Sequence, residues 1–332
     1  MGAGSCDRES KVKALLETVA DTGDRLVKAS HGKICFDAAQ ALDRSSDRDL
    51  AEAGPWSPNR HCRLVRASDA WIAVSLARKD DIELLPAWLG TPLDATPWET
   101  VISAAAKRTA KDLVSAAIEL HLPVARLGEA EALDPPKLDQ GRKGNDIILD
   151  ISALWAGPYC GGLLAEAGHR VVKIESPNRP DPTVRHMPRL DARLNGRKER
   201  KSMTFGGPQL LSMADKAGVI ITSARPHALA RMGLNEKQVF ARNPGLLWIA
   251  ITAHGWRGDA AMRVGFGDDC AAAGGLLRWD DGTPQFIGDA LADPLTGMLA
   301  ATLALEAMDS GKTGLIDISL ARTAASFAEA MA

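Results

Sequence analysis

The sequence has few aromatic residues: phenylalanine, tryptophan and tyrosine together make up 5% of 332 residues, and Tyr159 is the single tyrosine. Proteins that bind single-stranded nucleic acid stack bases on aromatic side chains, and this chain offers little for such recognition. The formal net charge is only -2, and the basic residues are spread along the chain. Nucleic acid is therefore not an expected partner.

Paired cysteines and long apolar runs are also missing. The five cysteines include no Cys-x-x-Cys pair, which argues against a zinc site or disulfide framework and is typical of a reducing compartment. The longest apolar run, Gly297 to Met308, is far short of the ~20 residues that span a bilayer. The first residues, MGAGSCDRESKVKA, do not resemble a signal peptide. We expect a cytoplasmic protein with no membrane partner.

The first half of the chain predicts a helical segment followed by a small α+β domain. KVKALLETVADTGDRLVKA has apolar residues at helical spacing, and the breaker GPWSPN follows it. HCRLVRASDAWIAVSLAR predicts two strands joined by a turn, and IELLPAWLG and WETVISAAAKRTAKDLVSAAIELHL predict helices. The expected boundaries are a helical N-terminal segment over 1–54, a small α+β domain over 55–134, and a Pro-, Gly- and charge-rich linker over 135–145.

Residues 146–332 alternate between predicted strands and helices, which indicates a doubly wound, Rossmann-like α/β domain. DIILDIS and RVVKIES flank a helix expected from Pro158 to Gly168, so these two strands should be parallel. The first turn lacks Gly-x-Gly-x-x-Gly, because Gly157 stands alone there. Binding of NAD or FAD in the usual mode is therefore not expected. The helix N-terminus can still hold an anion or a pantetheine-like chain, and a purely structural turn is the alternative.

ILDISALWAGPYCGGLLAEAGHRVVKIESP resembles the opening of the class III CoA-transferases of the CaiB/BaiF type. This superfamily includes formyl-CoA transferase, carnitine CoA-transferase and α-methylacyl-CoA racemase. Four later stretches are similar to family segments in the family's order: RKERKS, SARPHALARMGL, RNPGLLWIAITAHGWRG and IGDALADPLTG. The resemblance covers residues 146–332 and implies a CoA-binding catalytic domain there.

The first half is similar to the family's smaller domain, but here this region precedes the large-domain region instead of following it. SDAWIAVSLARKDDIELLPAWLG and RTAKDLVSAAIELHLPVARLGEAEALDPP resemble a domain that normally follows the large-domain segment. The chain is interpreted either as a permuted arrangement or as the end of one copy followed by the start of another. Family members form intertwined dimers, so the resemblance implies a homodimer, with a heteromer as the alternative.

The resemblance assigns the nucleophile to Asp293 in IGDALADPLTG. In the family, the matching carboxylate attacks an acyl-CoA thioester to give an acyl-aspartyl anhydride. The released CoA thiolate converts this to an aspartyl-CoA thioester, and the acceptor acid repeats the sequence in reverse. Taken alone, an aspartate before a proline is usually a helix N-cap. Asp289 is the rival carboxylate.

CoA carries a 3′-phosphate and a diphosphate, which arginine and lysine bind well. The contacts that the resemblance implies are Arg231, Arg225, Arg200, Lys201 and the turn residues Ala156, Gly157 and Pro158. Arg197 and Lys198 belong to the same charge run, for which a solvated face is the alternative. The position after Glu175 often holds a CoA-binding arginine in the family; it is Ser176 here, and Arg179 is the candidate substitute.

No metal is expected, and racemase chemistry is disfavoured. The racemase branch carries Gly-His-Asp before its Gly-rich turn, whereas GFGDDCAAAGG places Phe266 and Gly267 there, so one proton-transfer base is missing. Asp268 and Asp269 are interpreted as an exposed acidic loop, with a place in the lining of the site as the alternative. Four histidines lack metal-ligand spacing and are interpreted as surface or hydrogen-bonded core residues: His169, His186, His227 and His254.

The sequence thus predicts an enzyme that moves coenzyme A from an acyl-CoA thioester to an acceptor carboxylic acid. An acyl-CoA and a carboxylic acid are the expected binding partners. Two alternatives stay open: an acyl-CoA racemase or isomerase of the same fold, and a noncatalytic partner subunit of a CoA-transferase complex.

Overall fold

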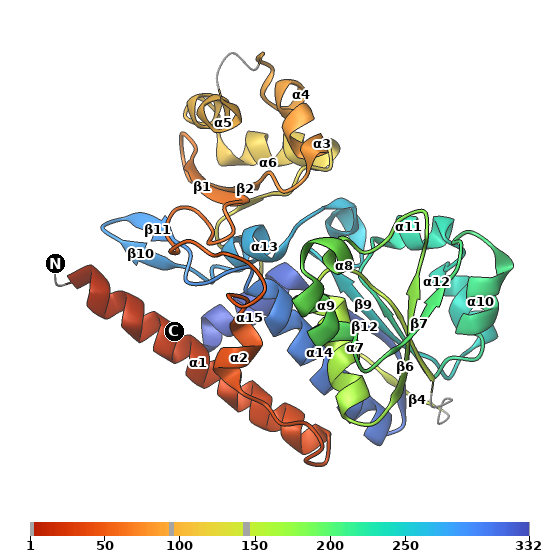
Figure 1. Cartoon of the computed structure of the whole chain (residues 1–332). Helices are drawn as coiled ribbons and strands as arrows, with labels where there is room; N and C mark the ends of the chain where they lie inside the picture. The colour runs from red at the N-terminus through yellow and green to blue at the C-terminus, as the bar shows by residue number, and fades with distance from the viewer. Residues whose placement is uncertain (1–2, 93–95, 142–146, 332) are drawn as a thin grey trace.

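The computed structural model describes residues 3–92, 96–141 and 147–331. Its largest sheet has seven strands in the order β4-β12-β9-β8-β5-β6-β7 (Figure 1). Neighbouring strands run parallel, except that β4 is antiparallel to β12. The strands are β4 (Asp139–Gln140), β5 (Ile147–Ile151), β6 (Arg170–Glu175), β7 (Glu199–Ser202), β8 (Val219–Thr222), β9 (Leu247–Thr252) and β12 (Lys312–Ser319). The mostly parallel α/β sheet predicted for the second half is confirmed.

Helices connect these strands. They are α7 (Ala156–Glu166), α8 (Pro182–His186), α9 (Pro188–Asn195), α10 (Pro208–Ala214), α11 (Pro226–Arg231), α12 (Glu236–Arg242), the 3-10 helix η1 (Gly258–Met262), α13 (Gly267–Ala273), α14 (Ala292–Asp309) and α15 (Leu320–Ala330). Between α13 and α14 lies a hairpin of β10 (Arg278–Asp280) and β11 (Thr283–Gln285).

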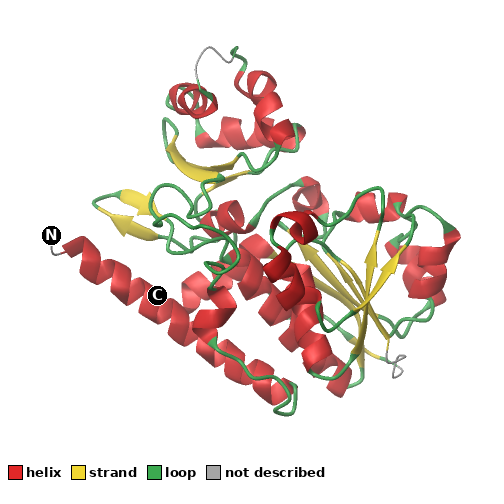
Figure 2. Ribbon diagram, viewed as in Figure 1, coloured by secondary structure: helices red, strands yellow, loops and turns green. Residues whose placement is uncertain are grey.

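Both faces of the sheet are covered by helices, as Figure 2 shows. Alternate side chains of one strand enter different layers because strand residues alternate in direction. Ile148 of β5 and Ile249 of β9 pack with α7 and α14, whereas Leu149 and Trp248, their immediate neighbours, pack with α10, α11 and α12. Such strands are apolar throughout, which is why DIILDIS and LLWIAITA are recognisable in the sequence.

The order of the strands locates the expected binding edge. The chain runs from β5 to β6 and β7 on one side, and then returns to β8, β9 and β12 on the other. The direction reverses between β5 and β8. In open α/β sheets, ligands bind outside the carboxyl ends of the strands at this switch point.

The strands and helices from β1 to β3 form a second, smaller body at the top of Figure 1. Its antiparallel sheet β1-β2-β3 is covered by four helices, with Ile72, Trp88 and Leu113 buried between them. The elements are β1 (Cys62–Arg66), β2 (Trp71–Ser75), α3 (Lys79–Glu83), α4 (Leu85–Leu89), α5 (Pro97–Ala105), α6 (Ala110–Glu119) and β3 (Val124–Arg126). The two strands and the helices predicted for this region are present.

The smaller body is joined to α13 through the backbone. After β3, the N–H of Gly128 donates to Ala272 O at 3.0 Å and that of Ala130 to Ala273 O at 2.9 Å. The helix that carries Asp268 and Asp269 is therefore held from the side of the smaller body.

The N-terminal segment contains α1 (Ala3–Ala29) and α2 (Ala38–Leu42). The predicted helix is confirmed, and Leu15 of α1 is buried in the main core. Part of the predicted linker pairs with the sheet as β4, and residues 142–146 lie outside the described part of the chain. No described helix has the length and hydropathy needed to cross a bilayer.

Candidate active site

The carboxyl ends of β5 and β8 meet at the switch point. After β5, the N–H of Ala153 donates to Ser223 Oγ at 2.9 Å, which ties the turn to the end of β8. Leu154 follows with a left-handed φ of 69° and is 40% exposed. A left-handed leucine is strained, and such strain is concentrated at functional sites.

The predicted turn residues Ala156, Gly157 and Pro158 form the first turn of α7 and are buried. A side chain on Gly157 would lie 2.2 Å from Ser152 Cβ, so only glycine fits there. No side chain caps this helix, whose N-cap is Trp155. Its first amides therefore face the switch point, where an anion or a polar chain can accept from them.

Four buried charged residues lie under this turn. Lys198 Nζ donates to Asp150 Oδ2 at 2.7 Å and to Pro158 O at 2.7 Å. Lys173 Nζ donates to Ser152 O at 2.5 Å and lies 3.7 Å from Asp181 Oδ2. We call Asp150, Lys173, Asp181 and Lys198 the balanced cluster, because it contains two positive and two negative groups.

The interpretation of the charge run as a solvated face is wrong for Lys198, which is buried at 8% exposure. Arg200 and Lys201 are exposed on β7, two strands from β5. Arg200 is paired with Asp191 at 2.5 Å and Glu175 at 3.3 Å. The structure therefore does not bring these two residues to the switch point.

Arg225 and Arg231 lie at the two ends of α11, next to the switch point. Arg225 Nη1 is 3.0 Å from His121 Nδ1 of the smaller body and 2.9 Å from Met262 O. Burial, together with Arg78 and Arg231, lowers the pKa of Arg225, which places the three guanidinium groups close together. This basic patch spans α11 and the smaller body.

Asp293 lies in the first turn of α14 and is partly buried. It is not the N-cap, which is Leu291, so the helix-capping alternative is not observed. Among the described residues, no side chain or backbone group donates a hydrogen bond to its carboxylate. A side chain on Gly267 would lie 2.3 Å from Asp293 Oδ2, so the start of α13 is directly against it. Burial raises the pKa of Asp293 to about 7.

Both carboxylate oxygens of Asp289, the rival candidate for the nucleophile, accept hydrogen bonds. Arg44 donates to its Oδ2 from both Nε, at 2.7 Å, and Nη2. Asn59 Nδ2 donates to its Oδ1 at 2.6 Å. A buried carboxylate bound on both oxygens is a structural ion pair rather than a free nucleophile.

The interpretation of Asp268 and Asp269 as an exposed acidic loop is wrong. Both begin α13 and are buried, at 5% and 0% exposure. Asp268 accepts from Asn59 Nδ2 and from the N–H of Ala290, and Asp269 accepts from Ser75 Oγ at 2.7 Å. Burial raises their pKa values to about 6 and about 7. We call Asp268, Asp269, Asp289, Asp293 and Arg44 the acidic cluster.

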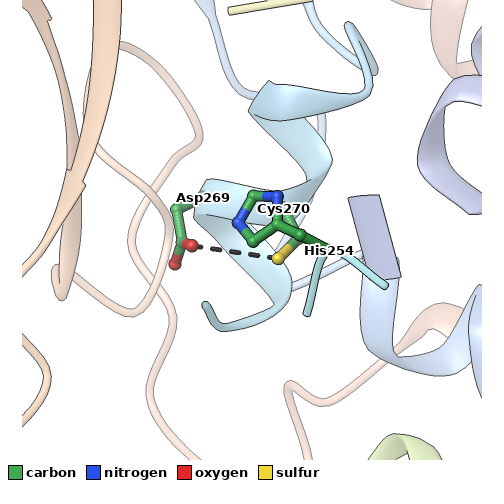
Figure 3. A group of neighbouring side chains, drawn as sticks. All are labelled: His254, Asp269 and Cys270. Carbon is green, nitrogen blue, oxygen red and sulfur yellow. Dashed lines mark hydrogen bonds between the residues drawn. The ribbon is translucent and has the colours of Figure 1, made fainter. Parts of the chain in front are cut away.

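The interpretation of His254 as a surface or hydrogen-bonded residue is also wrong. It is buried, and within the described chain its Nε2 has no hydrogen-bond partner. Figure 3 shows its ring beside Cys270 and Asp269, whose Sγ and Oδ2 are 3.8 Å apart. One ligand atom from each residue lies within 4.8 Å of the others, a donor set that zinc accepts. The Arg263 guanidinium opposes a cation there: after burial, it is the charge that lowers the pKa of His254.

Sequence reasoning missed Arg44, Asn59 and Ser75. All three come from the first half of the chain; Arg44 and Asn59 precede the stretches that carry the family resemblance, and Ser75 lies in SDAWIAVSLARKDDIELLPAWLG, for which the resemblance assigned no site residue. An arginine in the helical segment carries no local signal for a partner that follows 245 residues later.

The model of CoA-transferase family III matches residues 145–332. A succinyl-CoA–D-citramalate CoA-transferase from Chloroflexus aurantiacus is 31% identical over 194 residues, which are 52% of this chain and 48% of the relative. The alpha subunit of a succinyl-CoA–L-malate CoA-transferase from Chloroflexus aurantiacus is 30% identical over 194 residues, 52% and 45% of the two chains. A crystal structure of a hypothetical protein from Mycobacterium tuberculosis is 26% identical, with a TM-score of 0.49 over 57% of each chain. The chain spans about half the length of the curated relatives it matches.

Proposed function

Because the chain belongs to CoA-transferase family III, we propose that it moves coenzyme A from an acyl-CoA thioester to an acceptor carboxylic acid, with Asp293 as the nucleophile. The observation that carries the proposal is the contrast among four neighbouring aspartates. Asp268, Asp269 and Asp289 accept hydrogen bonds from named donors, whereas no described group donates to Asp293. An unpaired, partly desolvated carboxylate retains its nucleophilicity.

The chemistry consists of four displacements at carbonyl carbon. An Asp293 oxygen attacks the thioester and the carbon–sulfur bond breaks. This step releases CoA thiolate and forms an acyl-aspartyl anhydride. The thiolate attacks the aspartyl carbonyl and releases the first acid, which leaves an aspartyl-CoA thioester. The acceptor carboxylate attacks this thioester, which releases CoA thiolate and forms a second anhydride between Asp293 and the acceptor. The thiolate then attacks the acceptor's carbonyl carbon. The new acyl-CoA leaves, Asp293 is regenerated as a carboxylate, and no net proton is consumed.

The basic patch supports a placement for CoA. Arg225 and Arg231 at α11 are suited to its phosphates, and Arg78 extends the patch toward the nucleophile. The Arg78 guanidinium lies 5.6 Å from the centre of the Phe266 ring, and Phe266 precedes the glycine that lies against Asp293. The cofactor's charged end would lie at α11 and its thioester at Asp293, with Ala156, Gly157 and Pro158 beside the pantetheine chain. Arg200 and Lys201 stay predictions from the resemblance.

We propose that the whole protein has two domains and a cytoplasmic location and acts as a homodimer. The separate buried core of the smaller body supports the division at residues 55–134. Light scattering on the pure protein, alone and with acyl-CoA, tests the dimer. A monomeric mass, or a mass that becomes dimeric only with a second chain, would contradict it.

Covalent trapping tests the nucleophile. The protein is incubated with a panel of acyl-CoAs, trapped with hydroxylamine or borohydride, and digested for peptide mass spectrometry. We expect a modified peptide containing Asp293, and a loss of the adduct of at least 10³-fold in Asp293→Asn.

Two outcomes would contradict this assignment. An adduct that persists in Asp293→Asn and disappears in Asp289→Asn would move the nucleophile to Asp289. CoA binding without any adduct would instead favour an isomerase or a noncatalytic subunit. The variant Asp215→Asn, at an exposed ion pair on α10, is the control for unspecific effects.

A further inference from the structure

The segment before the smaller body sends two polar side chains into the candidate site. Arg44 is 7% exposed, and its guanidinium lies 4.7 Å from the centre of the Trp155 ring at the start of α7. Asn59 is 8% exposed, and its Nδ2 donates to both Asp268 and Asp289 at 2.6 Å. Its Oδ1 accepts from Ser57 Oγ and from the N–H of His61, so the amide orientation is fixed.

These contacts continue to the nucleophile. Asp268 accepts from the N–H of Ala290 at 2.7 Å, and Ala290 has a left-handed φ of 46°. The carbonyl of Ala290 in turn accepts from the N–H of Asp293 at 3.0 Å. The strained turn that orients the start of α14 is therefore held by carboxylates, and those carboxylates are held by Arg44 and Asn59.

We propose that Arg44 is a positioning residue for the reaction at Asp293: it holds Asp289 in place and sets a positive charge among the carboxylates that surround the nucleophile. The inference rests on the proposed function, because it concerns the reaction proposed at Asp293. It assigns to the N-terminal segment, outside residues 145–332 that match the family, a part in building the site.

The charges around Asp293 support this role. The groups that face it or its immediate partners are Arg44, Asp268, Asp269, Asp289, the Cys270 thiol and His61. Burial raises the pKa of Asp293, the three aspartates raise it further, and Arg44 is the charge that lowers it. Without Arg44, the nucleophile would lose the positive charge that offsets its three acidic neighbours in a desolvated site.

The test compares Arg44→Met, which keeps the length of the side chain, with Arg44→Lys, which keeps the charge. The rate of acyl adduct formation on Asp293 is measured from pH 5.5 to 9. We expect the acid limb of Arg44→Met to move up by at least about one pH unit, so that the rate falls roughly 8-fold or more at pH 6.5 and less than 3-fold at pH 9. Arg44→Lys should recover most of this shift.

Arg242→Met, at an exposed ion pair on α12, is the matched control and should leave the profile unchanged. An equal loss at every pH in Arg44→Met would overturn the proposal, because misfolding or misplacement alone lowers the rate without moving the limb. Thermal unfolding of each variant identifies one that fails to fold. In that case Arg44→Gln, which also removes the charge, carries the test, and an unshifted profile together with a normal rate would overturn the proposal.

A second measurement separates this inference from the proposed function. A water-soluble carbodiimide reacts with protonated carboxyl groups, so labelling of the Asp293 peptide reports its titration without acyl-CoA. If labelling extends to higher pH in Arg44→Met but no acyl adduct forms in any protein, the positioning role stands and the transferase proposal fails. If adducts form and labelling is the same in both proteins, the positioning role fails alone.

Discussion

Two buried ionic clusters at the carboxyl edge of the sheet differ in charge balance. The balanced cluster pairs two lysines with two aspartates beneath the β5–α7 turn. The acidic cluster places one arginine among four aspartates at the starts of α13 and α14. Both hold a turn with a left-handed, non-glycine residue, Leu154 in the first and Ala290 in the second.

The consequences for the carboxyl groups are opposite. Burial acts to raise the pKa of Asp150, yet Lys173 and Lys198 lower it below its usual value. In the acidic cluster, burial raises the pKa of Asp269 and Asp293 to about 7. Burial therefore produces a fixed ion pair where counter-charges are matched, and groups that bind and release protons near neutral pH where they are not.

The largest expected effect comes from a substitution that breaks the balanced cluster. Lys198→Met removes the direct ion-pair partner of the buried Asp150, leaves Lys173 as its nearby positive charge, and should lower the free energy of unfolding by about 3–5 kcal/mol. Adding Asp150→Asn removes the carboxylate charge, so the double variant should recover part of the loss. Urea denaturation followed by circular dichroism measures both.

The control for this effect is the exposed pair between Arg170 and Glu199, whose side chains are 59% and 56% exposed. Arg170→Met should cost far less than Lys198→Met, because exposed ion pairs contribute little to stability. A similar cost for Lys198→Met and Arg170→Met would show that the balanced cluster does not stabilise the fold.

Each cluster also has a glycine with no room for a side chain. A Cβ on Gly161 would lie 2.8 Å from Asp150 Oδ2, and one on Gly267 would lie 2.3 Å from Asp293 Oδ2. Gly161→Ala should cost about 1–3 kcal/mol of stability by overpacking. Gly267→Ala should displace the nucleophile and reduce adduct formation at least 10-fold. Gly207→Ala, with open space around it, is the control and should change neither quantity appreciably.

The smallest expected effect concerns the pH dependence of stability. The pKa of Asp293 is raised from 3.8 to about 7, so between these values the folded protein binds more protons than the unfolded chain. Its contribution therefore becomes less favourable as pH rises from 4 to 7, and is constant above 7. Asp293→Asn should stabilise the protein on the order of 1–2 kcal/mol at pH 8, after allowance for partial solvent access, and little at pH 4.

For Asp69→Asn we expect the change in stability to depend on pH in the opposite direction. A backbone hydrogen bond from Ala110 lowers the pKa of Asp69, so this carboxylate stabilises the fold above its unfolded pKa and loses that effect as pH falls. Urea unfolding of both variants from pH 4 to 8 measures the two trends. A pH-independent difference for Asp293→Asn would contradict the raised pKa.

The parts of the fold that depend on local pattern were predictable. Continuous apolar strands separated by helices indicate a parallel sheet, and β5, α7 and β6 lie where DIILDIS, the Ala-Gly-Pro turn and RVVKIES predict them. The family resemblance singles out Asp293 among the acids, and the structure shows how its surroundings differ. What local pattern cannot show is which charged side chains become buried.

Asp268 and Lys198 illustrate the reason. Two adjacent aspartates after a glycine, or a lysine in a basic run, have the appearance of solvated loops. Each is buried because its partner comes from a distant segment: Asn59 for Asp268, and Asp150 for Lys198. Sequence periodicity reports the local direction of a side chain, whereas the meeting of these segments is a property of the complete fold.

The distance along the chain between Arg44 and its partner also has a kinetic consequence. Asp150 and Lys198 are 48 residues apart, whereas Arg44 and Asp289 are separated by 245. Contacts between distant segments form slowly because a long loop must close first. On a ribosome, the balanced cluster can therefore assemble while the chain is still growing. We expect the acidic cluster to close late in folding, and its closure to take up protons from solvent near neutral pH because burial raises the pKa values of Asp269 and Asp293. Refolding should then slow as pH rises, with Asp293 among the last groups to reach its final position.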